Sequence, residues 1–431
     1  MGPAKKILIY SMNFAPELTG IGKYNGELAE WLSKQGYQVR VITAPPYYPQ
    51  WAIKKGYSAT RYQKEQLFPN VLAWRCPIWI PSKVSGVNRL LHLLSFAITS
   101  FPILFIQLFW RPHMLFVVEP PLVISPASVL LAKCFRIKTW LHVQDFEVDA
   151  AFDLGLLPNQ SIFKTVVLSV EQWLMKRFDV VSTISAKMKA KLVKKGVALN
   201  KIRFFPNWVN TRSVYPLDEY ISAYREQLAI RKDDIVYLYS GNMGEKQGLE
   251  IVLEVAKRLK RFKHIHFILC GEGVAKERLL LQAEQQRLKQ VHFLPLQPIE
   301  RLNDLLNTAD VHLLIQKNNA SDLVMPSKLT GILASGRCII ATANENTSVA
   351  QAMSEANAGV VVQAEQMEQL ADAIYSLSLD KELRRIYGKN ARTYAENRLG
   401  LDSIMHNFHR DISDLASGKE NVNEGGINAQ G

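Results

Sequence analysis

The chain has 431 residues, of which 48% are hydrophobic and 21% charged. This composition excludes a mostly disordered chain, a coiled coil and a collagen, and the length predicts two domains. The formal net charge of +13 lies in the first half, where residues 1–215 hold 27 Lys and Arg against 11 Asp and Glu. Such asymmetry predicts either a polyanionic partner, namely nucleic acid or an anionic membrane, or a solvated basic face.

The cysteines and the start of the chain indicate the compartment. Cys76, Cys134, Cys270 and Cys338 lie far apart, without the spacing of a metal site. This usage predicts a reducing environment and no structural zinc. The first apolar stretch, residues 7–10, is too short for the core of a signal peptide. We therefore expect a cytoplasmic protein.

Short apolar runs alternate with helical patterns along the first half. A strand at 6–10, a helix at 25–35 and a strand at 38–43 form one βαβ unit, with Gly36 ending the helix. Further strands are expected at 114–118, 138–143, 180–184 and 201–205. This order is typical of a doubly wound α/β domain.

The second half repeats the same order of elements. A strand at 235–239 precedes a helix at 249–259, and further strands are expected at 264–269, 291–294, 311–315, 338–341 and 359–362. We predict two doubly wound, Rossmann-like α/β domains facing a cleft, where the carboxyl ends of the strands bind ligands. The expected domains are 1–214 and 215–400, followed by a helix at 401–416 that can cross back to the first domain and a disordered tail at 417–431.

Each half carries a glycine-containing loop between its first strand and first helix. Gly20 and Gly22 occupy this place in the first half, and Gly241 and Lys246 occupy it in the second. Backbone N–H groups at such a loop can approach a phosphate, and Lys246 can donate to a diphosphate. The alternative is a plain tight turn with a surface lysine. The loops lack the lysine of a P-loop, so adenylate chemistry is unsupported.

Two later segments of the second half also suit an anionic ligand. Gly271 and Glu272 end a strand, where the backbone can approach a nucleotide base or simply turn toward the next helix. Residues 326–328, which are Pro326, Ser327 and Lys328, open a helix whose first-turn N–H groups form an anion site. Asp322 precedes them and is either a ligand for a sugar hydroxyl or a loop carboxylate. Lys317 is expected to be an ordinary surface lysine.

His142 and Asp145 follow one another closely at a strand end on the cleft side of the first half. His142 can accept or position a hydroxyl proton, and Asp145 can orient or bind the substrate. The alternative for His142 is a satisfied structural histidine.

Residues 90–110 contain no Asp, Glu, Lys or Arg and have the length of a transmembrane helix. Strands on both sides of the run belong to one sheet, so a single span is rejected. A helix pair that dips into one leaflet, or a buried core helix, remains. The expected helix at 185–195 adds five lysines, and we predict that both segments meet an anionic membrane.

Several short motifs occur in an order known from one enzyme family. They are residues 16–22, His142, 205–207, 240–248, 271–273 and 326–336. Over roughly residues 5–415 the chain resembles the retaining glycosyltransferases of family 4, which have the GT-B fold. Residues 10–17, 44–49, 142–145 and 326–328 are similar to the colanic-acid group of that family.

The resemblance implies that the second domain binds a nucleoside-diphosphate sugar and the first binds the acceptor, without a metal or other cofactor and with retention. It implies transfer of a sugar, L-fucose from GDP-fucose in that group, to a polyprenyl-diphosphate-linked sugar in exopolysaccharide biosynthesis. The base is guanine or uracil. His142 and Lys246 would be catalytic, and Asp145 and Asn207 would bind the acceptor, at the inner face of the plasma membrane.

The chain departs from the family at three positions. Asn242 stands where the family has an arginine, so Lys246 is the remaining cation of that pair. The two family glutamates fall near Leu323 and Gly331, and Asp322 is a shifted candidate for the first.

Two alternatives stay open: an epimerase or phosphorylase on the same scaffold, and a non-catalytic subunit that binds nucleotide sugar. Nucleic-acid binding lacks a recognition motif.

Overall fold

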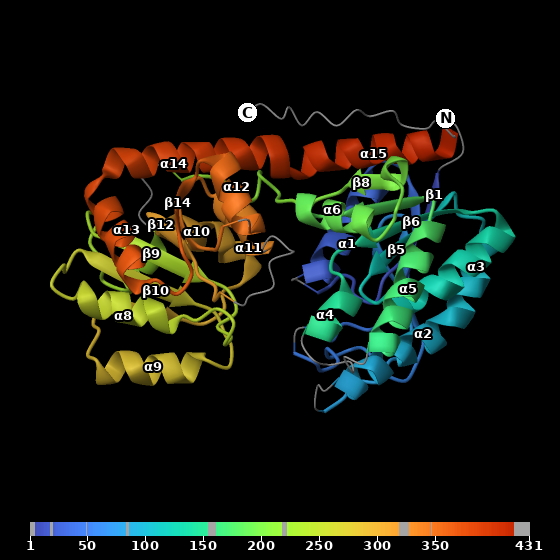
Figure 1. The fold of residues 1–431 in the computed structure, drawn as a ribbon, viewed down its shortest axis with the longest axis horizontal. Coiled ribbons are helices and arrows are strands. Elements are labelled where there is room, and N and C mark those ends of the chain that lie inside the picture. The colour runs from blue at the N-terminus through green and yellow to red at the C-terminus, as the bar shows by residue number, and fades with distance from the viewer. Residues whose placement is uncertain are drawn as a thin grey trace. The chain divides into compact units, whose positions relative to one another are not determined.

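The computed structural model describes residues 5–17, 20–48, 50–82, 86–153, 161–217, 222–318, 327–345 and 347–417. The chain forms two compact units, Met1–Pro206 with Met405–Gly431 and Asn207–Ile404 (Figure 1). The boundary lies at Pro206, before the expected residue 214, because Val209 and Val214 pack into the core of the second unit. Of the expected tail at 417–431, Ser417 is the last residue of α15 (Leu401–Ser417), and residues 418–431 lie outside the described residues.

The first unit contains an eight-stranded sheet in the order β3-β4-β2-β1-β5-β6-β7-β8. Its strands are β1 (Lys6–Tyr10), β2 (Gln38–Thr43), β3 (Gln63–Phe68), β4 (Val71–Arg75), β5 (Met114–Glu119), β6 (Lys138–Val143), β7 (Val180–Thr183) and β8 (Ile202–Phe204). All neighbours pair in parallel except β3 and β4. The parallel strands other than β4 match the expected apolar runs, whereas β4 and its hairpin with β3 were not expected.

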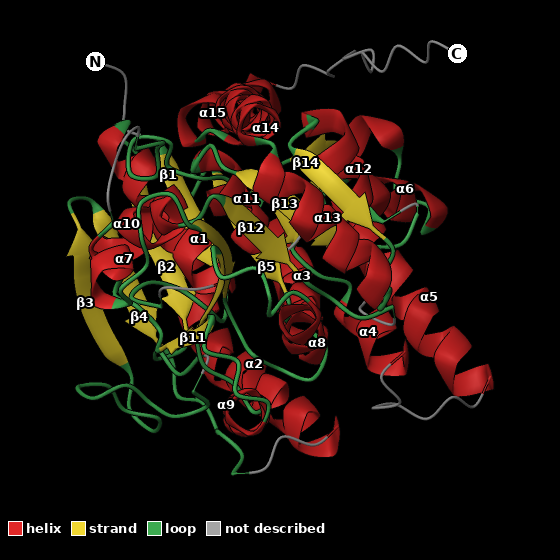
Figure 2. Cartoon of the chain, turned by 90° about the vertical axis from the view of Figure 1, so that its left-hand side faces the viewer, coloured by secondary structure: helices red, strands yellow, loops and turns green. Residues whose placement is uncertain are grey.

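Helices of the first unit cover this sheet (Figure 2). They are α1 (Gly20–Lys34), α2 (Gly86–Leu108), α3 (Ser125–Phe135), α4 (Glu147–Asp153), α5 (Ser161–Arg177), α6 (Ala186–Lys194) and the greater part of α15 (Leu401–Ser417), with short 3-10 turns at Leu122–Ile124 and Leu199–Lys201. Helix α1 begins at Gly20, five residues before the expected start. Its first turn therefore contains both glycines.

Helix α2 is one continuous helix, so the helix pair, one of the two alternatives for this segment, is wrong. Pro102 lies inside it. The hydroxyl of Ser100 bonds to the carbonyl of Phe96 at 2.5 Å and to the Tyr10 hydroxyl at 2.5 Å, which ties this part of the helix to β1. The same helix buries His92, Phe96 and Leu104, so one face belongs to the core.

The second unit contains a six-stranded, all-parallel sheet in the order β11-β10-β9-β12-β13-β14. Its strands are β9 (Ile235–Ser240), β10 (Ile265–Cys270), β11 (Val291–Leu294), β12 (Val311–Leu314), β13 (Cys338–Thr342) and β14 (Gly359–Val362). Its helices are α7 (Ala223–Gln227), α8 (Glu250–Arg258), α9 (Lys276–Gln285), α10 (Leu302–Thr308), α11 (Ser327–Ala334), α12 (Ser348–Ala356), α13 (Met367–Leu379) and α14 (Lys381–Tyr394), with a 3-10 turn at Ile299–Arg301 and a π-helical turn at Ala395–Leu399.

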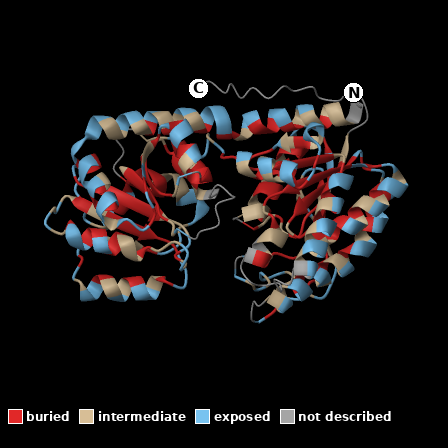
Figure 3. Cartoon of the chain, in the orientation of Figure 1, coloured by how far each residue is buried: buried red, intermediate tan, exposed pale blue. Residues whose placement is uncertain are grey.

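Both sheets are buried between helices, as Figure 3 shows by the buried residues at the centre of each unit. Strands β9, β10, β12 and β13 are mostly apolar and mostly buried, which is typical of parallel strands covered on both faces. Their carboxyl ends carry the loops that begin at residues 241, 271, 315 and 343. Ligands of doubly wound sheets bind at this edge.

Candidate functional site

The loop after β9 is a strained turn held by several hydrogen bonds. Gly241 has φ +141°, which only glycine adopts readily. The Tyr239 hydroxyl donates to the Asn242 carbonyl at 2.6 Å. The N–H groups of Gly241 and Met243 donate to the carbonyls of Cys270 and Glu272, at 2.9 and 2.8 Å. The loops after β9 and β10 are therefore fastened together.

Gly271 and Gly273 allow this close approach between the two loops. A Cβ on Gly271 would collide with the Gly241 carbonyl, and one on Gly273 would collide with the Met243 backbone. Packing between loops therefore already requires these two glycines. Glu272 is exposed and pairs with Lys276 at 2.7 Å, an ion pair that holds the pKa of Glu272 below its usual range.

Lys246 lies exposed in the same loop. No ion pair of its ammonium occurs among the residues that the structure describes. Its carbonyl accepts a hydrogen bond from the N–H of Lys317 at 3.1 Å, and a Cβ on Gly248 would meet the aliphatic chain of Lys317. Lys317 is therefore part of this loop region and is not an independent surface control for Lys246.

Lys328, in the first turn of α11, lies on the other side of the turn at Gly241. Its Nζ is 4.1 Å from the centroid of the Tyr239 ring. Desolvation of the amine lowers the pKa of Lys328 to about 7, although part of the residue stays exposed. Within the described ranges, no carboxylate pairs with it. Asp322, Pro326 and the side chain of Ser327 lie outside the described residues.

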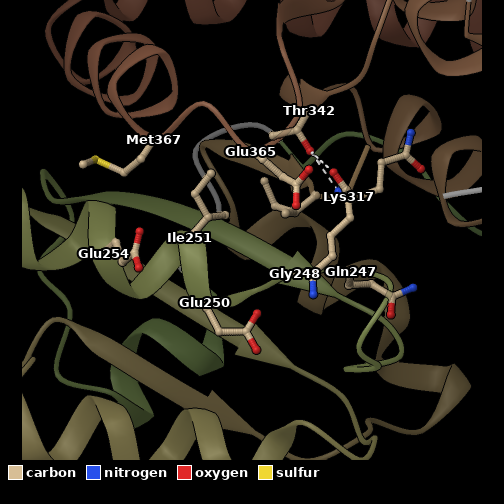
Figure 4. A pocket seen from close by; sticks show the side chains of 11 residues that line it. Gln247, Gly248, Glu250, Ile251, Glu254, Lys317, Thr342, Glu365 and Met367 are labelled. Atoms are coloured by element: carbon tan, nitrogen blue, oxygen red, sulfur yellow. Dashed lines mark hydrogen bonds between the residues drawn. The ribbon is translucent and has the colours of Figure 1, made fainter. Parts of the chain in front are cut away.

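A pocket of about 330 Å³ opens beside this loop (Figure 4). It is lined by Gln247, Gly248, Glu250, Ile251, Glu254, Ile315, Gln316, Lys317, Thr342, Glu365 and Met367. The Thr342 hydroxyl donates to the Gln316 carbonyl at 3.0 Å, which joins β13 to the loop after β12. Three glutamates make this pocket unsuitable for a phosphate, in contrast to the cationic turn at Gly241.

The glycine loop of the first unit is built on a buried glutamate. Glu17 accepts hydrogen bonds from the N–H groups of Tyr47 and Tyr48, at 3.2 and 3.1 Å, and from Asn13 at 3.0 Å. A Cβ on Gly22 would meet Glu17 Oε2 at 2.5 Å. Gly22 thus makes room for Glu17, while Gly20, at φ +57°, begins α1. Sequence reasoning overlooked Glu17.

His142 is buried, with both ring nitrogens bonded. Nδ1 lies 2.9 Å from Ser182 Oγ, and Nε2 lies 3.0 Å from Gln144 Nε2. Burial lowers the pKa of His142 to about 3, so the ring is neutral near pH 7. A base this weak accepts a proton poorly at neutral pH. The geometry therefore favours a positioning role for His142 over proton transfer.

Two carboxyl groups, those of Asp145 and Glu119, lie at the same edge of the sheet as His142. Asp145 is partly exposed, and burial raises its pKa. Glu119 ends β5 and is fully buried, and neither of its carboxylate oxygens has a hydrogen-bond partner in the described structure. Burial raises the pKa of Glu119 well above its usual range, which favours the protonated acid. Asn207 is also buried and lies in the second unit.

Two lysines of α6 point into the protein. Lys195 is buried and pairs with Glu171 and with Asp149, the latter at 2.8 Å. Lys191 pairs with Asp149 at 3.1 Å. The expectation that these two side chains face a membrane is therefore wrong, because they neutralise the partly exposed Asp149 of α4 and the buried Glu171 of α5.

Exposed apolar side chains instead lie on α2, α3 and α5. We call the surface that they form the apolar face. The rings of Phe105 and Phe109 contact the ring of Phe135, which joins α2 to α3. The members are Val87, Leu90, Leu91, Leu94, Ile98, Phe101, Phe105, Ile106, Phe109, Leu130, Ile162, Val166, Val170 and Trp173. Among the described helices, α2 alone has the length and hydropathy of a membrane span.

No group of three His, Cys, Asp or Glu side chains in the described ranges has the arrangement of a metal site. The glycine turns and the two lysines are thus the features of the second unit that suit an anion.

Comparison with known proteins identifies the family. Residues 19–208 match the model of the glycosyl transferase 4-like domain, and residues 221–394 match that of the glycosyl transferases group 1. The chain is 44% identical over 413 residues to a protein of Escherichia coli K12 named as a colanic acid biosynthesis glycosyl transferase, WcaI. The match covers 94% of this chain and 99% of WcaI. The chain belongs to the WcaI-like glycosyltransferases.

Solved structures confirm the GT-B fold of this glycosyltransferase. Sucrose-phosphate synthase from Thermosynechococcus elongatus matches with a TM-score of 0.73 and 16% identity, over 96% of this chain and 100% of that one. HepE from Anabaena, in complex with UDP and glucose, matches with a TM-score of 0.68 and 14% identity, over 95% and 100%.

Proposed function

We propose that this glycosyltransferase transfers a sugar from a nucleoside-diphosphate sugar to a polyprenyl-diphosphate-linked sugar, with retention, in exopolysaccharide biosynthesis. The observation that carries the proposal is the pair of lysines at the loop after β9. Lys246 and Lys328 have no carboxylate partner in the described structure. Lys246 lies in the loop of the glycine turn at Gly241, and Lys328 Nζ lies 3.8 Å from the Cβ position of Gly241. Unneutralised cations beside a glycine turn suit a diphosphate.

In this proposal Lys246 and Lys328 assist the departure of the nucleoside diphosphate from the donor sugar. The bond between the sugar C1 and the β-phosphate oxygen breaks, and its electron pair stays on the diphosphate. Lys246 and Lys328 stabilise the charge that develops there. The acceptor hydroxyl bonds to C1 on the face that the diphosphate leaves, and its proton goes to the departing phosphate oxygen. No metal is required, because the two ammonium groups supply the positive charge.

The first unit supplies the acceptor side in this proposal. Asp145 is partly exposed at the carboxyl edge of β6 and can accept a hydrogen bond from a sugar hydroxyl. His142 acts by holding Gln144, and Glu17 holds the loop before α1. Asn207 contributes from the segment that follows β8. The donor is GDP- or UDP-linked, and the resemblance to the colanic-acid group of the family implies L-fucose from GDP-fucose.

The apolar face supports a location at the inner face of the plasma membrane. Ile98 is 70% exposed and Leu130 is 64% exposed. Soluble monomeric proteins rarely expose extended apolar patches, because contact of apolar surface with water costs free energy. Arg177 stacks on the exposed ring of Trp173, with 4.8 Å between its guanidinium and the ring centroid. Tryptophan beside arginine suits the interface of an anionic bilayer. The polyprenyl acceptor is itself embedded there.

A non-catalytic nucleotide-sugar-binding subunit is the second candidate. Asn242 and Gly331 favour it, because a cation and a carboxylate of the family are missing there. Such a subunit would bind nucleotide sugar without turnover.

A panel of GDP, UDP, ADP and their sugars tests donor binding by thermal shift. A ligand at 100 times its Kd stabilises a protein by about 2.7 kcal/mol. We expect a shift with GDP or UDP that Lys246→Ala weakens. Lys289→Ala is the matched control. Lys289 is an exposed lysine that precedes β11, so it lies at the amino ends of the strands, whereas the loop after β9 lies at their carboxyl ends. The absence of any shift with wild type would refute the proposal.

A further inference from the structure

A buried phenol lies between the two parts of the diphosphate site. Tyr239 is fully buried, yet its two functional groups both point to the turn at Gly241. Its hydroxyl donates to the Asn242 carbonyl at 2.6 Å, and its ring lies under the Lys328 ammonium at 4.1 Å. The Cβ position of Gly241 is 3.8 Å from both Lys328 Nζ and the Tyr239 hydroxyl. One side chain thus touches the turn and the cation together.

We propose that Tyr239 is a positioning residue that holds the Lys328 ammonium against the Gly241 turn, ready for the diphosphate of the donor. The inference rests on the proposed function and extends it. An aromatic face attracts an ammonium through its quadrupole without carrying a negative charge. A carboxylate in the same place would neutralise Lys328 and repel the diphosphate. A ring therefore orders the cation and leaves its charge available for the ligand.

The chain offers a matched control for this residue. Tyr237 is also a fully buried tyrosine of β9, in the same core, and its hydroxyl donates to the Ile374 carbonyl, away from the turn. Tyr237→Phe and Tyr237→Leu remove the same chemical groups from the same strand. If Tyr239 had a merely structural role, matching substitutions of Tyr239 and Tyr237 would weaken nucleotide binding equally.

The test is a double-mutant cycle measured by calorimetric titration with GDP and UDP. Lys328→Met should weaken binding about tenfold or more, as the loss of a charge-assisted hydrogen bond does. Tyr239→Leu should weaken it by about three- to thirtyfold, the range of a cation–π contact. The double variant should bind no more weakly than Lys328→Met alone, because the ring acts through the lysine. Tyr239→Phe, which keeps the ring, should restore most of the affinity.

Three results would overturn the inference: wild-type affinity in Tyr239→Leu, losses that multiply in the double variant, or an equal loss in Tyr237→Leu. If Tyr239→Leu does not fold, fluorinated phenylalanines at position 239 replace it. Fluorination weakens the ring quadrupole, so affinity should fall stepwise from Tyr239→Phe, and a flat series would refute the role. Wild type that binds neither GDP nor UDP would refute the proposed function itself, before any variant is compared.

Discussion

The ammonium of Lys328 rests 4.1 Å above the ring of Tyr239, 89 positions earlier in the chain, with no carboxylate beside it in the described structure. Desolvation lowers its pKa from 10.5 to about 7. Between these values the unfolded chain binds a proton that the folded site does not, so stability rises with pH. Lysine at this position therefore costs stability at neutral pH, and the proposed function assigns it a diphosphate as its ligand.

Lys328→Met should accordingly stabilise the protein while weakening nucleotide binding. The rise in melting temperature should be larger at pH 6.5 than at pH 9.5, because the cost of the charged lysine fades as the amine deprotonates. Melting curves without ligand measure the effect, with Lys289→Met as the exposed control. A variant that melts below wild type at both pH values would contradict the desolvated site.

The same titration predicts a pH dependence of donor binding. Diphosphate requires protonated Lys328, so the affinity of wild type for GDP or UDP should fall as pH rises above about 7. Lys328→Met should lack this fall, and the difference between the two proteins removes the titration of the nucleotide itself. Parallel slopes in wild type and variant would show that Lys328 does not meet the phosphate.

Lys246→Ala should lower turnover more than binding, because preorganised charge acts mainly on the departing diphosphate. Removing one such group costs about 2–4 kcal/mol in the transition state. Steady-state transfer rates measure this loss. Lys289→Ala is the control in place of Lys317, whose N–H bonds to the Lys246 carbonyl. Turnover within threefold of wild type would remove Lys246 from the site.

His142→Ala should lower both the melting temperature and turnover, because the ring is buried against Ser182 and Gln144. With its pKa lowered to about 3, His142 contributes stability that is present above pH 6.5 and fades as pH falls toward 3. The melting temperatures of wild type and variant should therefore converge on acidification. An ionisation near pH 6.5 in kcat/KM that disappears in His142→Ala would instead assign it proton transfer.

Membrane binding is expected to depend on the apolar face rather than on α6. The triple variant Ile98→Glu, Leu130→Glu and Val166→Glu should no longer float with vesicles of anionic lipid. The control, Val274→Glu, Leu281→Glu and Leu296→Glu, changes three equally exposed apolar residues of the second unit and should float as wild type does. Wild type that stays at the bottom of the gradient would show that the apolar face does not bind lipid.

The sequence was sufficient to predict the parallel strands other than β4, because the central ones, such as β1, β5, β9 and β13, are apolar runs that lie buried in the sheets. It did not predict the β3–β4 hairpin, where the polar run Gln63–Phe68 forms the edge of the sheet and buries little. The glycine loops and Lys246 were predicted from their place after a strand. The contact between Tyr239 and Lys328 was not, because it joins β9 to α11 across the fold.

The same limit explains the incorrect expectation for α6. Five lysines in and next to a short helix predict a basic surface. However, the ion pairs of Lys195 with Glu171 and of Lys191 with Asp149 form only when α4, α5 and α6 pack together. Pairing between charges distant in sequence leaves no local pattern. The apolar face, in contrast, was partly visible in residues 90–110, and the structure extends it to α3 and α5.

A transfer assay tests the central claim most directly. Labelled GDP-fucose, and a panel of other labelled nucleotide sugars, is incubated with the protein and a polyprenyl-diphosphate-linked glucose, and the label is followed into the lipid extract. Wild type and Lys289→Ala should move label into the lipid with at least one donor, whereas Lys246→Ala should move far less. Donor binding by wild type with no label in the lipid for any donor would contradict the account and favour a non-catalytic subunit.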